Sequence, residues 1–156
     1  MAILDIKKAG DPVLKQVAAP VDRLTKWHRK LLDDMAETMY SADGVGLAAP
    51  QIGKSLRIVV IDVQDENGLL ELVNPVITMR EGSVTDSEGC LSVPEVYGDV
   101  ERAARVTVEY TDRRSRRRSL TAEGLLARCI QHECDHLDGR LFIDIAVSLR
   151  KEEKKG

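Results

Sequence analysis

Two histidines that stand four residues apart, His132 and His136, are the residues of this chain best suited to chemistry. They lie in the stretch QHECDH at residues 131–136, and Glu133 follows the first of them. Residues four apart lie one turn apart on the same face of a helix, so both imidazoles can reach one ion. Glu133 lies beside that face, where it can move a proton without binding the metal. The motif therefore predicts a metal-dependent hydrolase.

A third ligand is needed, because a catalytic site usually holds its ion with three protein groups and leaves one position open. No histidine follows the motif, and the only downstream glutamates, Glu152 and Glu153, lie in a polar tail. Cys90 is the better candidate, since the glycine before it and the proline soon after it indicate a constrained turn. Nothing obvious supplies a fourth ligand, so a structural metal site is not expected.

The other two cysteines have different expected positions. Cys129 lies three residues before His132 and shares its helix face, so it is expected to line the floor of the pocket. Cys134 points elsewhere. Three cysteines do not form the disulfide framework of a secreted domain, and in a reducing compartment cysteine usually packs as a small hydrophobic residue.

A glycine-rich segment, GVGLAAPQIG at residues 44–53, is the third feature with possible chemistry. Its glycines allow close approach of backbone to backbone, and Gln51 can donate a hydrogen bond to a developing oxyanion. Taken alone, the segment is weak evidence for a site, because glycine and small residues more often form an ordinary loop.

Length and composition indicate one soluble domain spanning residues 1–156. Hydrophobic residues make up 43% of the chain and charged residues 31%, and the formal net charge of −3 argues against a DNA-binding protein. No apolar run approaches the roughly 18 residues needed to cross a bilayer, so no membrane partner is expected. Residues 1–8 resemble neither a secretory signal nor a transit peptide. A cytoplasmic location is expected.

The elements around these motifs predict an α+β fold. A short helix over residues 12–17 precedes a stronger one that Thr25 caps and that ends near Gly44. In that stronger helix a four-residue apolar repeat, Trp27, Leu31, Met35 and Met39, predicts a core face. A buried strand is expected at residues 56–63, further strands at 69–73, 76–80 and 105–110, and a polar strand ending near 120.

The metal motif is expected on a C-terminal helix that Thr121 caps and that ends at Gly139. Antiparallel or mixed sheets should pack around this helix. Residues 141–145 are expected to pack back on the body, and residues 150–156 to form a flexible, charged tail.

Together the three segments, GVGLAAPQ, EGCLS at residues 88–92 and QHECDH, resemble peptide deformylase. This hydrolase removes the formyl group from N-formylmethionine on new bacterial polypeptides. The motifs occur in the family's order, and the resemblance covers the chain from Pro12 to about Ile145.

The resemblance implies a role for each matching residue. The implied metal ligands are Cys90, His132 and His136, and Glu133 is the implied proton-transfer group. The Gln51 side chain and the Leu91 backbone N–H are the implied donors to the oxyanion. Family members typically use Fe²⁺, and Ni²⁺, Co²⁺ or Zn²⁺ can occupy the site, whereas a Cys/His₂ ligand set alone suggests zinc.

The implied substrates are N-formylmethionyl nascent peptides in a bacterial or virus-infected bacterial cell. The methionine side chain is expected in an apolar pocket formed by Val45, Leu125 and Cys129. The family's peptide runs as an added strand that pairs with backbone near Val45, Gly46 and Gly89.

Three features leave alternatives open. Many relatives extend into a C-terminal helix linked to ribosome docking, whereas this sequence ends soon after Leu149, which makes that docking mode questionable. Arg128 replaces an apolar residue common in relatives, and either alters the pocket rim or points to solvent. Five arginines within residues 113–118 favour a solvated hairpin tip over contact with ribosomal RNA. They are Arg113, Arg114, Arg116, Arg117 and Arg118.

Two other functions fit the metal motif. A metalloprotease would need a downstream third ligand and a cleft for both sides of an internal peptide bond. A metal-stabilised interaction protein would hydrolyse neither a formylated nor an internally cleavable peptide.

Overall fold

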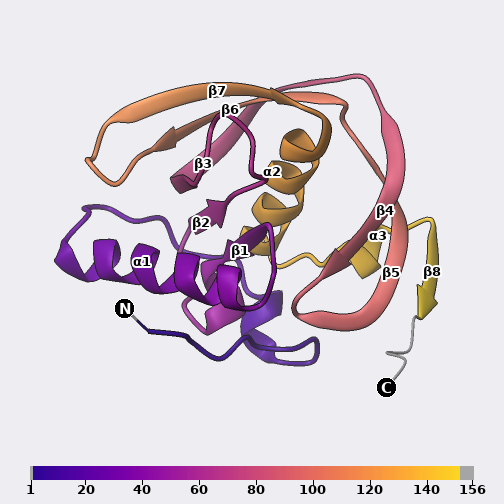
Figure 1. Ribbon diagram of the computed structural model, residues 1–156, viewed down its shortest axis with the longest axis horizontal. Helices are drawn as coiled ribbons and strands as arrows, with labels where there is room; N and C mark the ends of the chain where they lie inside the picture. The colour runs from indigo at the N-terminus through magenta and orange to yellow at the C-terminus, as the bar shows by residue number, and fades with distance from the viewer. Residues whose placement is uncertain (1, 152–156) are drawn as a thin grey trace.

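Two antiparallel sheets and a helix between them form the body of the protein (Figure 1). The computed structural model describes residues 2–151, and within them the strand orders are β1-β2-β3-β6-β7 and β4-β5-β8. The strands are β1 (Gly46–Ala48), β2 (Ile58–Ile61), β3 (Leu70–Glu81), β4 (Val84–Cys90), β5 (Val93–Arg102), β6 (Arg105–Thr111), β7 (Arg117–Glu123) and β8 (Ser148–Lys151). The helices are α1 (Lys26–Ser41), α2 (Gly124–Leu137) and α3 (Phe142–Ile145), with 3₁₀ turns η1 (Pro12–Lys15) and η2 (Ala49–Ile52). The α+β prediction is confirmed.

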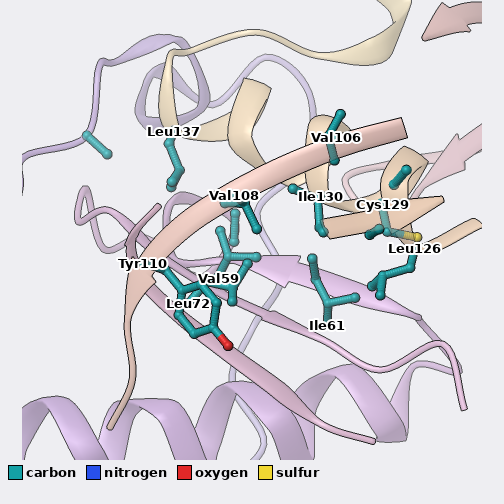
Figure 2. Packing of buried hydrophobic residues seen from close by; sticks show 14 residues of the cluster. Val59, Ile61, Leu72, Val106, Val108, Tyr110, Leu126, Cys129, Ile130 and Leu137 are labelled. Carbon is teal, nitrogen blue, oxygen red and sulfur yellow. The ribbon is translucent and has the colours of Figure 1, made fainter. Parts of the chain in front are cut away.

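Strand β2 lies between the two long helices. Its sequence, IVVI, is fully buried, because alternate side chains point to opposite faces of the sheet and both faces are covered. Val59 and Ile61 pack with α2 (Figure 2), whereas Ile58 and Val60 pack with α1. The continuous apolar run in the sequence reflects this double burial.

Helix α1 covers the sheet with the predicted apolar face. Leu31, Met35 and Met39 are buried against β1 and β2. The first residue of the repeat, Trp27, is 51% exposed, so the core face begins one turn later than predicted. At the helix start, the Thr25 N–H donates to Nδ1 of His28 over 3.0 Å.

Helix α2 begins two residues later than predicted, since Glu123 and not Thr121 is its N-cap residue. Thr121 lies in β7, where its Oγ1 is 2.8 Å from Oγ1 of Thr107 on β6, so it does not cap the helix. The chain turns into α2 at Gly124, whose φ of +61° falls in the left-handed region that glycine adopts at little cost. Leu126 and Ile130 then pack on the sheet (Figure 2).

Several strand boundaries differ from the prediction. The runs at 69–73 and 76–80 form one strand, β3, which passes Pro75 through an irregular register between Val73 and Val76. Proline is tolerated at such a bulge because no ladder hydrogen bond is lost there. The hairpin of β4 and β5 was not predicted, since β4 is polar and mostly exposed and shows no apolar alternation.

The C-terminal part returns to the small sheet. Leu141 and Phe142 are buried with Val93 and Val100, as predicted for residues 141–145. Residues 150 and 151 belong to β8, which pairs with β5, so the predicted flexible tail is wrong at these two positions. The rest of that predicted tail lies outside the described residues.

Candidate metal centre

The three predicted metal ligands converge. Cys90 ends β4, while His132 and His136 lie one turn apart on α2, and their ligand atoms all lie within 4.8 Å of one another. Sγ of Cys90 is 3.4 Å from Nε2 of His136. A tetrahedral ion with metal–sulfur and metal–nitrogen bonds of about 2.3 and 2.0 Å separates such atoms by about 3.5 Å. The donor set therefore fits a divalent transition metal.

The His132 ring is oriented by a carboxylate that the sequence analysis did not single out. Nδ1 of His132 is 2.9 Å from Oε1 of Glu88, which is buried. Burial alone would raise the pKa of Glu88, but hydrogen bonds from Arg102 and His132 outweigh it and lower the pKa to about 2. An ionised carboxylate only accepts, so Nδ1 donates to it, which leaves Nε2 as the nitrogen that can bind a metal once it gives up its proton.

Glu133 is buried beside these ligands. Its Oε2 lies 4.0 Å from Nε2 of His132, and its Oε1 has no hydrogen-bond partner among residues 2–151. A Cβ added at Gly46 would come within 2.5 Å of Oε2, so only glycine leaves room for this carboxyl group. Burial raises the pKa of Glu133 to about 7, and the charge of His132 opposes the rise only in part. Such a group can accept and return a proton near neutral pH.

The Gln51 amide is held with its NH₂ group toward the ligands. Its Oε1 accepts the Ala48 N–H over 2.9 Å, and its Nε2 donates to Oγ of Ser92 over 3.0 Å. Nε2 is also 3.6 Å from Sγ of Cys90. Because the carbonyl end is fixed by the backbone, the donor end must face the site.

An N-terminal segment, residues 7–9, to which no role was assigned from the sequence, holds the backbone at Gln51 and at the turn between β4 and β5. The Lys7 N–H donates to the Gln51 carbonyl over 2.6 Å, and the Ala9 N–H to the Ser92 carbonyl over 2.8 Å. Nζ of Lys8 donates to the Leu91 carbonyl over 3.3 Å. These are mostly backbone contacts, which no residue pattern in the sequence reports.

Two of the three predicted ligands, Cys90 and His132, line a pocket of about 620 Å³ between β1 and the β4–β5 hairpin. The residues predicted to donate to the oxyanion or to contact substrate all line it, namely Val45, Gly46, Gln51, Gly89, Leu91, Leu125 and Cys129. Leu125 is 56% exposed at the rim and Cys129 is buried. Cys134 packs against the main core instead, as predicted.

Arg128 does not point to solvent, because it is buried and lies in the pocket wall. Its Nη1 donates to Oε2 of Glu88 over 2.5 Å and to the Val100 carbonyl over 2.9 Å, and its Nη2 donates to the Val84 carbonyl over 2.7 Å. Of the two alternatives, the solvent-facing side chain is therefore wrong, and Arg128 lies at the pocket.

The chain matches the family model for polypeptide deformylase over residues 3–152. It belongs to the peptide deformylase family. A peptide deformylase from Pelotomaculum thermopropionicum is 54% identical over 151 residues, covering 97% of this chain and 96% of that one. One from Halothermothrix orenii is 52% identical over 152 residues, covering 97% and 99%.

Solved deformylase structures share the fold. The Thermotoga maritima enzyme has a TM-score of 0.91 at 42% identity, covering 95% of this chain and 100% of that one. The Synechococcus elongatus enzyme, in complex with actinonin, has a TM-score of 0.89 at 49% identity, covering 93% and 79%.

Family membership confirms the predicted activity. The chain is a deformylase, a hydrolase that removes the N-formyl group from new polypeptides. The metalloprotease and interaction-protein alternatives are thereby set aside. Across residues 2–151, no helix has the length and apolar character that a bilayer crossing requires.

Proposed function

We propose that Cys90, His132 and His136 hold the catalytic divalent ion of this deformylase. The convergence of these three donor atoms within 4.8 Å is the observation that supports the proposal. Fe²⁺ is the ion proposed from the family resemblance, while Zn²⁺, Ni²⁺ and Co²⁺ suit the same donors. Such an ion, when bound, supplies Lewis acidity that polarises the formyl carbonyl and acidifies water.

Glu133 is the proposed proton carrier. It accepts a proton from the attacking water and delivers it to the amine that leaves when the C–N bond breaks. Its burial and its pKa of about 7 support both halves of this cycle, since the group is basic enough to accept and acidic enough to donate. Gly46 keeps the carboxyl group close to the site by leaving it space.

The oxyanion is proposed to receive two hydrogen bonds, from Nε2 of Gln51 and from the Leu91 N–H. The fixed orientation of the Gln51 amide supports its part, because its donor end faces Cys90 before substrate binds. Removing one donor of this kind typically costs about 2.7–4 kcal/mol of barrier.

Gly46 is the proposed backbone partner for the substrate strand. β1 is at one end of its sheet, and the Val45 carbonyl already accepts the Asp62 N–H over 2.8 Å. Hydrogen-bonding directions alternate along an antiparallel pair, so the Gly46 N–H and C=O point away from β2, toward the free edge. Val45 instead contributes its half-exposed side chain, with Leu125 and Cys129, to the methionine pocket.

Gly89 is the proposed backbone partner on the other side of the substrate strand. It lies in β4, which is the end strand of the smaller sheet and also lines the pocket. A peptide strand between the edges of β1 and β4 would use backbone pairing, which reads no side chains. That suits an enzyme acting on N-formylmethionyl peptides of many sequences.

From the substrate we propose that the protein acts in the cytoplasm of a bacterial or virus-infected bacterial cell, with the ribosome as a partner.

The arginine cluster lies at the β6–β7 hairpin tip (Figure 1), as predicted. Arg113 pairs with Asp33 over 2.5 Å, and Arg118 lies 3.7 Å from Asp112. Because carboxylates neutralise part of the cluster, a solvated tip fits it better than an RNA-binding surface.

The decisive experiment combines anaerobic purification, metal analysis and a formate-release assay with formyl-Met-Ala-Ser on one sample. The wild-type chain should hold one ion per molecule and deformylate the peptide. His136→Ala should lose both the ion and the activity, whereas Cys134→Ala, on the same helix but facing the core, should keep both. Deformylation by metal-free His136→Ala protein would contradict the proposed ligand set.

A further inference from the structure

Glu88 lies at the centre of a buried charge cluster behind the metal ligands. Its Oε1 accepts from His132, and Arg102 binds both of its oxygens, with Nε and Nη2 each at 2.9 Å. Oε2 also accepts from Nη1 of Arg128. All four of these side chains are buried. The carboxylate that orients His132 is thus itself held by two guanidinium groups.

Arg102 is shared between two acids, which explains why a second arginine matters. Its Nη1 forms an ion pair with Oδ2 of Asp135 over 2.5 Å. Arg102 alone would therefore leave Glu88 and Asp135 with one cation between them. With Arg128, the cluster has two guanidinium groups for its two carboxylates. Among the described residues, Arg128 pairs with no acid other than Glu88.

Arg128 is fixed at more than one point. It donates to the carbonyls of Val84 on β4 and Val100 on β5, in addition to Glu88. These two carbonyls belong to the hairpin that also carries Cys90. The planar guanidinium group of Arg128 thereby connects α2, which carries the two histidines, to the hairpin that carries Cys90. A single ammonium group cannot reproduce this geometry.

We propose that Arg128 is a positioning residue of the metal centre, which slows metal loss by holding Glu88 against His132. The inference rests on the proposed ligand set. Without Arg128, Oε2 of Glu88 keeps only its hydrogen bond to Arg102, which also pairs with Asp135. The carboxylate is then free to turn away from Nδ1 of His132. Loss of the partner that orients a metal-binding histidine typically weakens metal binding about 10- to 100-fold.

The test measures release of Co²⁺ to excess EDTA from the Co²⁺-loaded full chain. Arg128→Met keeps the aliphatic stem and should release Co²⁺ roughly ten to a hundred times faster than wild type. Its cobalt absorption bands, which report ligand geometry, should also change. Neither readout depends on catalysis.

Arg57→Met is the matched control. Arg57 donates to the Leu137 carbonyl over 3.0 Å and to Oδ1 of Asp138 over 3.1 Å, so it also ties α2 to the body through a carbonyl and a carboxylate. It has no contact with Glu88. Its removal should lower the melting temperature but leave the Co²⁺ release rate and the absorption bands as in wild type.

Three results would separate the possible failures. If wild type binds no stoichiometric Co²⁺, the ligand set itself is wrong and the inference falls with it. If wild type binds Co²⁺ but Arg128→Met releases it no faster than Arg57→Met, the ligand set stands and Arg128 only stabilises the fold. If Arg128→Met does not fold, Arg128→Lys replaces it, and wild-type release by that variant would overturn the proposal.

Discussion

The two long helices pack on opposite faces of the same sheet but bury different chemistry. The inner face of α1 is mainly aliphatic, and its buried polar residues are Asp34 and Thr38. The inner face of α2 buries a charged and polar series: Arg128, Gln131, His132, Glu133 and His136. Burying a polar group is costly unless it finds a partner, so α2 depends on an organised set of partners whereas α1 depends on packing. Function is concentrated in the helix that is harder to bury.

Glu133→Gln should produce the largest effect and should confine it to catalysis. Gln cannot carry the proton between water and amine, so kcat/KM for formyl-Met-Ala-Ser should fall about 10²- to 10⁴-fold. The variant should keep its metal and should melt no lower than wild type, because an amide replaces a carboxyl group that burial disfavours.

Metal analysis and thermal unfolding on the same sample provide the control. Wild-type turnover would refute the proton-transfer role. A large drop in melting temperature would instead show that the α2 polar face stabilises the fold, which would remove the contrast between the helices.

Met35→Ala should produce the opposite outcome on α1. Met35 is fully buried, and truncation of a buried methionine costs about 2–5 kcal/mol of unfolding free energy. Urea unfolding should show this loss, while kcat/KM per folded molecule stays at the wild-type value. Trp27→Ala removes more atoms but at a half-exposed position, so it should cost less. A greater loss for Trp27→Ala would contradict the assignment of the core face.

Much of the site was predictable because local spacing determines it. The four-residue separation of His132 and His136 requires only a helix, and the glycine and proline near Cys90 mark a constrained backbone. The apolar repeat of α1 and the IVVI run of β2 likewise follow from periodicity. Each of these features is encoded within a few residues of the chain.

The hydrogen-bond partners of the proposed metal ligands were not predictable in the same way. Glu88 is visible in the sequence, but its bonds to Arg102, Arg128 and His132 join residues 14 to 44 positions apart. A charged residue inside a helix is usually solvent-exposed, so the sequence alone could not place Arg128 in the pocket wall. The β4–β5 hairpin was missed for a related reason, since its polar side chains show no buried face.

Asp34→Asn is the smallest expected effect and tests the one buried charge that α1 carries among the described residues. A hydrogen bond from Lys30 lowers the pKa of Asp34 below its ordinary 3.8, helped by the Ala2 N–H, although burial opposes the shift. A lowered pKa contributes stability above the ordinary value, and this contribution is lost as pH falls through the folded-state pKa.

Asp34→Asn should therefore cost about 1 kcal/mol of unfolding free energy at pH 7, because one charge-assisted bond is lost while the amide oxygen can still accept the Ala2 N–H. Urea unfolding at pH 7 and near pH 2 should show the difference from wild type shrinking on acidification. Deformylation at pH 7 should be unchanged. A loss of activity would mean that a buried charge on α1 also serves the site, and the division between the two helices would fail.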